Sequence, residues 1–378
     1  MTTPVRALYV HVPFCRTLCG YCDFYSTRLR SDQVAPLVDA LLAELRRWSD
    51  ARPLLFDTLF VGGGTPTTLP ADELERLLAG VAARRDPAAD VEFTVEANPA
   101  TVTPARAAVL ARCGVNRLSL GAQSFEPREL RVLDRRHRPE QVAETVALCR
   151  AAGLTRLSLD LIFGIPGQTR ESWARSLAAA LALDPEHLSC YGLTYEEGTP
   201  LTARRDAGRL RPLDEDTEAE QYEYAMDALA AAGRPQYELS NYARPGRECR
   251  HNLCYWHNEP YLGLGPSAAG FIDDVRYKNV ADTAAYVAAI RAGRPARVEE
   301  ETLPPERRAR ETAMLELRLV AGIDRRRFAA RYGPDPAELF AAAIARHTAA
   351  GLLEVDERSV RLTRAGRLLA NRVMADFV

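Results

Sequence analysis

The stretch Tyr9-Val-His-Val-Pro-Phe-Cys15-Arg-Thr-Leu-Cys19-Gly-Tyr-Cys22 decides the fold, because it places three thiols on one short loop. Cys15, Cys19 and Cys22 follow the spacing C-x3-C-x2-C, with no fourth soft ligand nearby. A zinc site normally completes its tetrahedron with a fourth Cys or His, whereas a four-iron cluster on three thiolates keeps one iron open. The spacing therefore favours a 4Fe-4S cluster with these cysteines as metal ligands. A disulfide or zinc loop is the alternative.

The composition is that of a globular protein with a sizeable core. A chain of 378 residues, 47% of them hydrophobic, suits one large domain plus a smaller one. No apolar run reaches membrane-span length, and the N-terminus enters a strand-like segment without a charged and apolar leader. Thiolates that wait for iron also require a reducing compartment. We therefore expect a cytoplasmic protein with no integral membrane segment, for which peripheral membrane contact stays open.

The charges exclude several classes of function. The net charge is -2 and no long block carries a single sign, so electrostatics give no reason to expect nucleic acid as a partner. Lys278 is the single lysine and lies outside any glycine-rich loop. A Walker-type nucleotide site is therefore excluded, and Schiff-base catalysis has little support.

Hydrophobic periodicity predicts a repeated strand-helix unit in the first half of the chain. In the first helical segment, apolar residues at 34, 37, 38, 41, 42 and 45 form the stripe of a core-facing helix. Thr103 with Pro104 predicts a helix start, and Gly114 and Gly153 predict helix ends. The expected strands are Leu8 to Val12, Thr58 to Val61, Val91 to Glu96, Arg117 to Leu120, Leu157 to Phe163 and Leu188 to Leu193. Six such units with right-handed crossovers predict an α/β fold, a partial (β/α)6 barrel.

Polar residues and glycines follow the predicted strands where the strands end. Gly62-Gly63-Gly64-Thr65 follows the second strand, and glycines at these positions would let a ligand touch the backbone. Glu96 ends the third strand, Gln123 follows the fourth, and Asp160 lies in the fifth. Tight turns and helix caps explain each signal alone. Because barrel sites lie at the carboxyl ends of the strands, the set as a whole indicates a binding site.

These motifs resemble the radical S-adenosylmethionine (SAM) family, in the branch that contains oxygen-independent coproporphyrinogen III oxidase and the heme chaperone HemW. The resemblance covers nearly the whole chain. It implies that Cys15, Cys19 and Cys22 hold the cluster, whose open iron chelates SAM. It further implies nine positions around SAM: Tyr9, Tyr21, Gly63, Gly64, Thr65, Glu96, Gln123, Arg135 and Asp160. By residue type, a carboxylate accepts from ribose hydroxyls or the amino group, and Arg135 pairs with the methionine carboxylate.

Two departures distinguish the branches. The oxidases share two features. A further cysteine stands two residues after the third cluster ligand, and a substantial N-terminal segment precedes the first strand. This chain has Asp23-Phe24 after Cys22, and its first strand begins almost at the first residue. Both features resemble HemW. The run Arg250-His251-Asn252-Leu253-Cys254-Tyr255-Trp256 agrees, because it matches an H-N-x-x-Y-W motif associated with heme binding in HemW proteins.

The resemblance implies that His251 contacts heme. An imidazole supplies one axial bond to iron, and Tyr255 and Trp256 offer flat surfaces for a porphyrin. Cys254, Cys249 and His257 are competing ligands, and a purely structural role for His251 and the aromatic residues is the other alternative. The remaining cysteines, at 113, 149 and 190, are expected to be buried hydrophobic residues.

The last part of the chain changes character. Helical segments near Glu306 to Val320, Arg325 to Arg331 and Pro336 to Ala350 precede two short strands, Leu352 to Val355 and Val360 to Leu362, and a final helix after Thr363. This order predicts a small winged-helix-like α+β domain, whose arginines leave DNA contact as a weak alternative. The expected division is 1–240 for the barrel, 241–300 for a connecting region with the H-N-x-x-Y-W motif, and 301–378 for the C-terminal domain.

The resemblance implies a heme chaperone that uses a 4Fe-4S cluster, SAM and heme, and passes heme to heme-accepting proteins such as respiratory enzymes. The alternative is an oxygen-independent coproporphyrinogen III oxidase, which decarboxylates its substrate by SAM-radical chemistry in porphyrin metabolism. A regulatory nucleic-acid-binding protein is the third class. Whether the chain acts as a radical SAM enzyme is left open, catalytic residues are unassigned, and the oligomeric state is expected to be monomer or homodimer.

Overall fold

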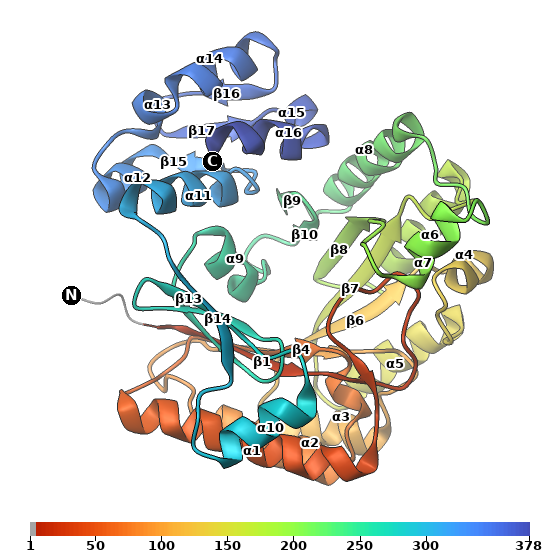
Figure 1. The fold of residues 1–378 in the computed structure, drawn as a ribbon. Coiled ribbons are helices and arrows are strands. Elements are labelled where there is room, and N and C mark those ends of the chain that lie inside the picture. The colour runs from red at the N-terminus through yellow and green to blue at the C-terminus, as the bar shows by residue number, and fades with distance from the viewer. Residues whose placement is uncertain (1–4) are drawn as a thin grey trace.

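A twelve-stranded mixed sheet organises the computed structural model, which describes residues 5–378 (Figure 1). Six neighbouring strands at its centre are parallel and follow chain order. They are β1 (Ala7–Val12), β4 (Thr58–Gly63), β5 (Glu92–Ala97), β6 (Arg117–Gln123), β7 (Arg156–Phe163) and β8 (His187–Gly192). Each overlaps one expected strand, so the predicted α/β fold with six strand-helix units is confirmed. The sheet starts at β14 and stops at β9, so the barrel is partial.

Helices follow each central strand and, apart from α7, cover the outer side of the curved sheet, from α1 at the bottom of Figure 1 to α8 at the upper right. They are α1 (Ser31–Ala51), α2 (Ala71–Ala82), α3 (Pro104–Arg112), α4 (Pro127–Val132), α5 (Pro139–Ala151), α6 (Arg170–Ala182), α7 (Pro200–Asp206) and α8 (Glu215–Ala231). Short elements stand before and between them: β2 (Phe14–Cys15), β3 (Thr27–Arg28) and the 3-10 helix η1 (Pro66–Thr68). Because the six strands run parallel, their carboxyl ends all lie at one edge of the sheet.

The helix boundaries follow the predicted chemistry. The Thr103 side chain accepts a hydrogen bond from the Arg106 amide at 3.3 Å, with Pro104 in the first turn of α3. Gly114 and Gly153 have φ of 77° and 89°, which glycine adopts without a Cβ penalty after a helix. The apolar stripe of α1 is buried except at Leu42, which is half-buried. Local sequence therefore determines where these helices start, stop and face.

Residues 236–302 extend the same sheet. β11 pairs in parallel with β1 on the side opposite β4, and three antiparallel strands follow it. On the other edge, β10 pairs with β8 and β9 pairs with β10. The elements are β9 (Gln236–Glu238), β10 (Asn241–Ala243), α9 (Arg250–Trp256), β11 (Tyr261–Leu264), β12 (Ala269–Ile272), β13 (Val275–Asn279), α10 (Thr283–Arg291) and β14 (Arg297–Thr302). All of these strands except β14 are shorter than the central six, and the periodicity did not predict them.

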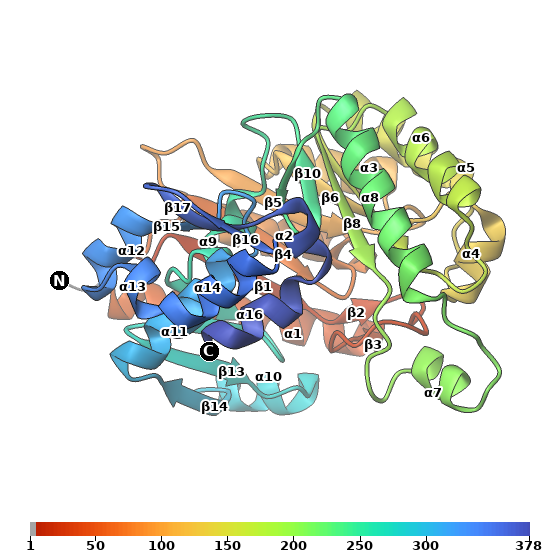
Figure 2. The ribbon, with the colours of Figure 1, turned by 90° about the horizontal axis from the view of Figure 1, so that it is seen from above.

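The C-terminal part has its own hydrophobic core. Its three-stranded antiparallel sheet has the order β15-β17-β16. In the view from above, its helices lie over the half of the molecule that contains β1 and β4, and α4, α5, α6 and α8 lie on the other side (Figure 2). Its elements are α11 (Pro305–Glu316), β15 (Ile323–Asp324), α12 (Arg325–Tyr332), α13 (Pro336–Leu339), α14 (Ala341–Ala349), β16 (Leu353–Val355), β17 (Ser359–Leu362), α15 (Arg364–Leu368), α16 (Ala370–Met374) and the 3-10 helix η2 (Ala375–Phe377).

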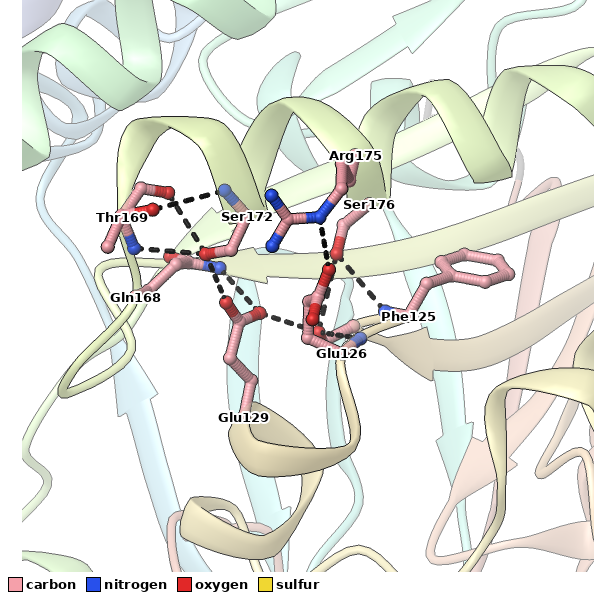
Figure 3. A network of polar contacts seen from close by, with 9 residues as sticks. Phe125, Glu126, Glu129, Gln168, Thr169, Ser172, Arg175 and Ser176 are labelled. Carbon is pink, nitrogen blue, oxygen red and sulfur yellow. Dashed lines mark hydrogen bonds and ion pairs between the residues drawn. The ribbon is translucent and has the colours of Figure 1, made fainter.

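A buried polar network holds the chain that follows β6 (Figure 3). The Glu129 carboxylate accepts hydrogen bonds from the hydroxyls of Ser124 and Ser172, both at 2.6 Å, and from the Gln168 amide at 3.0 Å. Ser124 follows β6, Gln168 follows β7 and Ser172 lies in α6. One carboxylate thus ties together three segments at the carboxyl ends of two strands. Because every donor is buried and paired, the network fixes the backbone close to the predicted site.

Candidate cluster and cofactor site

The three cysteines lie on the loop that begins at β2, and all three thiols are free and half-buried. Cys15 Sγ lies 3.6 Å from the Thr65 hydroxyl, and the Cys22 amide donates to the Cys19 carbonyl at 3.3 Å. Burial raises the pKa of the Cys15 thiol, and it raises the pKa of Cys22 to about 11. Iron binding must therefore displace protons from thiols that hold them tightly, so cluster assembly is expected to depend on pH.

Soft donors from one loop fit an iron-sulfur cluster, which takes cysteine thiolates at its irons. Among residues 5–378, no three His, Cys, Asp or Glu side chains converge closely enough to hold one metal ion. The positively charged side chain of Arg135 lies beside the thiols. Arg135 Nη1 lies 3.5 Å from Cys19 Sγ, and Nη2 donates to the Gly121 carbonyl at the end of β6. Burial by itself lowers the pKa of Arg135. The nearby Tyr21 and Cys19 raise it, and the net result is a pKa above the usual value.

Arg135 Nε is buried without a hydrogen-bond partner among the described residues. Such a donor is costly to leave unpaired, so it points to an acceptor that the protein itself does not supply. The methionine carboxylate of SAM is an acceptor of the right chemistry. Arg135, Gly121 and Gln123 also lie close together, since a Cβ on Gly121 would be 2.7 Å from Gln123 Nε2 and 3.2 Å from Arg135 Nη2.

The glycine segment after β4 lies against the start of the cysteine loop. A Cβ added to Gly64 would be 2.7 Å from the Pro13 carbonyl carbon, and one on Gly63 would be 2.5 Å from the His11 ring. The Gly64 amide donates to the Val12 carbonyl at 2.8 Å, and the Thr65 amide donates to the Phe14 carbonyl at 2.7 Å. That these glycines let a ligand touch the backbone stays a prediction, but the missing side chains of Gly63 and Gly64 also have a structural reason. They make room for the strand and loop that carry the cysteines.

Two half-buried carboxyl groups lie behind the glycines. Glu96 Oε2 accepts from the Gly63 amide at 3.0 Å, and Asp160 accepts from the Ser119 hydroxyl at 3.1 Å. Burial and the charge of Asp160 raise the pKa of Glu96 to about 7. Burial also raises the pKa of Asp160, although hydrogen bonds from Ser189 and Ser119 and the charge of Arg117 oppose the shift. Because Glu96 and Asp160 disfavour each other's charge, a cationic or hydrogen-bond-donating ligand would be favoured beside them.

Sequence reasoning missed several supporting residues. The Tyr9 hydroxyl lies 3.0 Å from His11 Nδ1, and His11 Nε2 lies 2.9 Å from the Tyr25 carbonyl. Burial and then the charge of Glu96 raise the pKa of Tyr9. Ser119 and Ser189 contact Asp160 from the neighbouring strands.

The signal for these strand residues was in the sequence. Arg117, Ser119, Gly121 and Gln123 alternate with apolar residues along β6, and Ser158 and Asp160 do so along β7. Successive side chains of a strand point to opposite faces, so this alternation marks a polar face inside the barrel. Contacts join several of the expected positions: Cys15 lies against Thr65, Cys19 lies against Arg135, and the Gly63 amide donates to Glu96.

His251 lies elsewhere. Its side chain is 1% exposed, and its ring is stacked on Phe60 with the centroids 5.1 Å apart. Nδ1 lies 2.9 Å from the hydroxyl of Thr58, the first residue of β4, and Nε2 lies 2.8 Å from the Tyr255 hydroxyl. Burial, with the charge of Arg117, lowers its pKa to about 3. Both ring nitrogens are occupied, so this arrangement leaves none for heme iron.

The competing ligands differ in access. Cys249 is fully buried, with its thiol 3.6 Å from Glu92 Oε1, and burial raises its pKa to about 12. Burial likewise raises the pKa of the half-buried Cys254 to about 12. His257 follows α9, and its side chain is 25% exposed. Of the three, only the His257 imidazole combines exposure with a donor atom that needs no deprotonation.

Comparison with known proteins identifies the family. The Radical SAM superfamily matches residues 9–180, and the HemN C-terminal domain matches residues 303–369. The heme chaperone HemW of Bacillus subtilis is 38% identical over 378 residues, covering 99% of both chains. The chain belongs to the HemW branch of the radical SAM superfamily. The predicted family and branch are confirmed.

Other members of the HemW branch agree. The heme chaperone HemW of Escherichia coli is 40% identical over 272 residues, covering 71% of this chain and 70% of that protein. Among solved structures, coproporphyrinogen III oxidase (HemN) from Escherichia coli, a radical SAM enzyme, superposes with a TM-score of 0.85 at 25% identity. The match covers 100% of this chain and 90% of HemN, so the two branches share one architecture. No helix among residues 5–378 has the length and apolar character to cross a membrane.

Proposed function

We propose that this protein is a heme chaperone, which binds a 4Fe-4S cluster through Cys15, Cys19 and Cys22, binds SAM at the strand ends, and passes heme to recipient proteins. The observation that carries the proposal is the near full-length similarity to proteins named heme chaperone HemW. The contacts of the cysteine loop with Thr65 and Arg135 support the cluster assignment. We place this activity in the cytoplasm.

Different residues of this chain would contact the cluster and SAM. Cys15, Cys19 and Cys22 would hold the cluster, which would supply an open iron position for SAM and redox chemistry. Arg135 would bind the SAM carboxylate through Nε, which has no acceptor within residues 5–378. Glu96 and Asp160 accept hydrogen bonds from ligand amino or hydroxyl groups, and Tyr9, Tyr21, Gly63, Gly64, Thr65 and Gln123 complete the surroundings. Whether the bound SAM is cleaved is a separate question, which product analysis answers.

The oxidase alternative is not favoured. Asp23 and Phe24 follow Cys22, where the oxidases place a further cysteine, and the Phe24 side chain is 67% exposed. The chain shares the fold of HemN, but the fold alone does not specify the reaction. The proteins named HemW match at higher identity than HemN does.

Reconstitution and heme transfer test the proposal. The full chain, loaded anaerobically with iron and sulfide, should show the broad visible absorbance of a cluster and then bind ferric heme on titration. Heme bound to the protein should move to apomyoglobin, observed as the change of the Soret band. The same preparation with SAM and a reductant should leave coproporphyrinogen III unchanged. Absence of heme binding would refute the chaperone proposal, and catalytic formation of protoporphyrinogen IX would establish the oxidase instead.

A further inference from the structure

The carboxyl end of β6 contains a β-bulge. Gly121 pairs with Asp160 of β7, and Gln123 pairs with the next residue of that strand. Ala122 is therefore an extra residue without a partner on β7. Bulges re-aim the side chains beside them and occur often next to active sites. The bulge thus sets the direction of the side chains at the end of β6, where we place the SAM site.

Gln123 has a φ of 65°, in the left-handed region. Among residues 5–378, the other non-glycine residues with positive φ are aspartates, one asparagine and one serine. Aspartate and asparagine tolerate this region because their short side chains hydrogen-bond to the local backbone, and the longer glutamine side chain is less suited to it. A strained residue persists only where its surroundings fix it, and such residues cluster at ligand sites. The conformation of Gln123 must therefore be maintained by its neighbours.

Two side chains from the segment between α4 and α5 hold the backbone just before Gln123. Arg135 Nη2 donates to the Gly121 carbonyl, and His137 Nε2 lies 3.1 Å from the Ala122 carbonyl. Each of the two residues before Gln123 thus receives a side-chain donor. One short segment of the chain fixes the bulge from outside the sheet.

The backbone after Gln123 is fixed as well. The Ser124 amide donates to the Ala122 carbonyl at 2.8 Å, and the Ser124 hydroxyl donates to Glu129 in the network of Figure 3. Gln123 therefore stands between anchored neighbours on both sides, and these contacts maintain its left-handed conformation.

The His137 ring makes a single polar contact. The residue is 5% exposed, and burial together with the charge of Arg135 lowers its pKa to about 4. The neutral ring carries one N–H. Because a carbonyl only accepts, this hydrogen lies on Nε2, and Nδ1 has no hydrogen-bond partner among the described residues. Within that part of the chain, the bond to Ala122 is therefore the one hydrogen bond of the His137 side chain.

The Gln123 side chain reaches the residues beside the cysteine loop. A Cβ on Gly121 would be 2.7 Å from Gln123 Nε2 and 3.2 Å from Arg135 Nη2, so the amide and the guanidinium lie together over Gly121. The same guanidinium contacts Cys19. An amide both donates and accepts, so in this position it can bind polar groups of a ligand beside the cysteine loop.

We propose that His137 is a positioning residue for SAM binding: its bond to the Ala122 carbonyl maintains the bulge that holds the Gln123 amide in the SAM site. The inference rests on the proposed function, in which Gln123 contacts SAM, and it adds a residue that does not contact SAM itself. A side chain that is fixed before the ligand arrives binds more tightly, because no affinity is lost to selecting the competent conformation.

Calorimetry with SAM on the cluster-loaded full chain tests this role. His137→Leu and His137→Asn should each weaken SAM binding by about three- to tenfold, because leucine has no donor and asparagine is too short to reach the Ala122 carbonyl. His137→Gln should bind like wild type, since its amide supplies a donor at nearly the reach of Nε2. Arg136→Ala is the matched control, because Arg136 is exposed and adjacent, and it should also bind like wild type.

A double-mutant cycle identifies the residue through which His137 acts. Gln123→Ala should weaken SAM binding on its own, and adding His137→Leu to it should have little further effect. An undiminished effect of His137→Leu in the Gln123→Ala background would show that His137 does not act through Gln123, and it would overturn the proposal.

Hydrogen exchange gives a measurement that needs neither the cluster nor SAM. In the cofactor-free protein, residues 121–124 should exchange faster in His137→Leu than in wild type, and His137→Gln should keep the wild-type protection. If His137→Leu does not fold, His137→Asn takes its place in every measurement. Unchanged SAM affinity in the leucine and asparagine variants, with normal binding by wild type, would refute the positioning role and leave the proposed function standing. Absence of SAM binding by cluster-loaded wild type would overturn both.

Discussion

Arg135 Nη1 lies 3.5 Å from Cys19 Sγ, although 116 residues separate the two in sequence. Arg135 belongs to the run Arg135-Arg136-His137-Arg138, in which Arg136 and Arg138 are exposed to solvent. Instead its guanidinium bridges the cysteine loop and the end of β6. The contact joins the proposed metal ligands to the proposed SAM site, so loss of the guanidinium should affect both.

Arg135→Ala should lower the iron content after reconstitution and weaken SAM binding by about tenfold or more, because it removes a buried charged donor. Iron analysis and calorimetry with SAM measure the two effects. Arg136→Ala is the control, since Arg136 is exposed and adjacent. Equal iron content and SAM affinity in all three proteins would contradict the assignment of Arg135.

Glu96 should make the stability of the cofactor-free protein depend on pH. Its pKa is raised to about 7 in the folded state, so the folded protein holds a proton that the unfolded chain releases at lower pH. The Glu96 contribution is therefore most favourable below the unfolded-state pKa and is lost as the pH rises towards 7, by up to about 3 kcal/mol.

Denaturation by urea at several pH values, compared with Glu96→Gln, measures this effect. The glutamine keeps an acceptor for the Gly63 amide and does not titrate. The variant should gain stability relative to wild type between pH 5 and pH 8 (about the range in which proteins are usually most stable). A constant difference between the two proteins across this range would show that Glu96 does not titrate there.

Much of the fold followed from local sequence. Apolar runs of β4, β5 and β7 are buried on both faces, and such strands are recognisable without knowledge of their partners. The carboxyl-edge rule then placed Glu96, Gln123 and Asp160 in one region. The strands β11 to β13 have four, four and five residues, and they are strands because they pair with distant segments such as β1.

The surroundings of His251 depended on contacts that no local pattern encodes. Thr58, which binds its ring, is 193 residues away, and Glu92, which accepts from its backbone amide, is 159 residues away. Gly64 is a similar case. A Cβ at this position would meet the backbone of Pro13, which belongs to a distant segment of the chain. Residue types indicated that these positions matter, but only tertiary contacts show how.

Gly64→Ala should destabilise the protein and lower cluster loading together. The added Cβ would be 2.7 Å from the Pro13 carbonyl carbon and 2.8 Å from the Phe14 carbonyl oxygen, and backbone atoms give way at a cost of about 1–3 kcal/mol. Urea denaturation and iron analysis measure the two effects. Gly192→Ala is the control, since its Cβ would be 3.3 Å from the Phe163 ring, which can shift. Normal stability with loss of SAM binding alone would favour the ligand-space explanation.

Glu129→Ala should destabilise the protein by about 1–3 kcal/mol, because Ser124, Gln168 and Ser172 lose their shared acceptor and keep only longer contacts to other groups. Glu126→Ala is a control in the same network (Figure 3). Glu126 pairs with Arg175, which is 61% exposed, and such a pair contributes about 1 kcal/mol or less. Urea denaturation compares the variants. Equal losses would show that burial does not distinguish the two carboxylates.

His251→Ala should destabilise the protein by about 2–4 kcal/mol and leave the heme spectrum unchanged. The variant loses the contact with Tyr255 within α9, and it also loses the contact with Thr58 and the stacking on Phe60, which fasten α9 to β4. Asn252→Ala is the control, because Asn252 is half-buried in the same helix and no hydrogen bond of its side chain is seen among residues 5–378. Urea denaturation and heme titration at a temperature where both variants are folded give the two measurements. Wild-type stability with loss of the Soret band would return the axial ligand to His251, and it would require the ring to leave its buried position when heme binds.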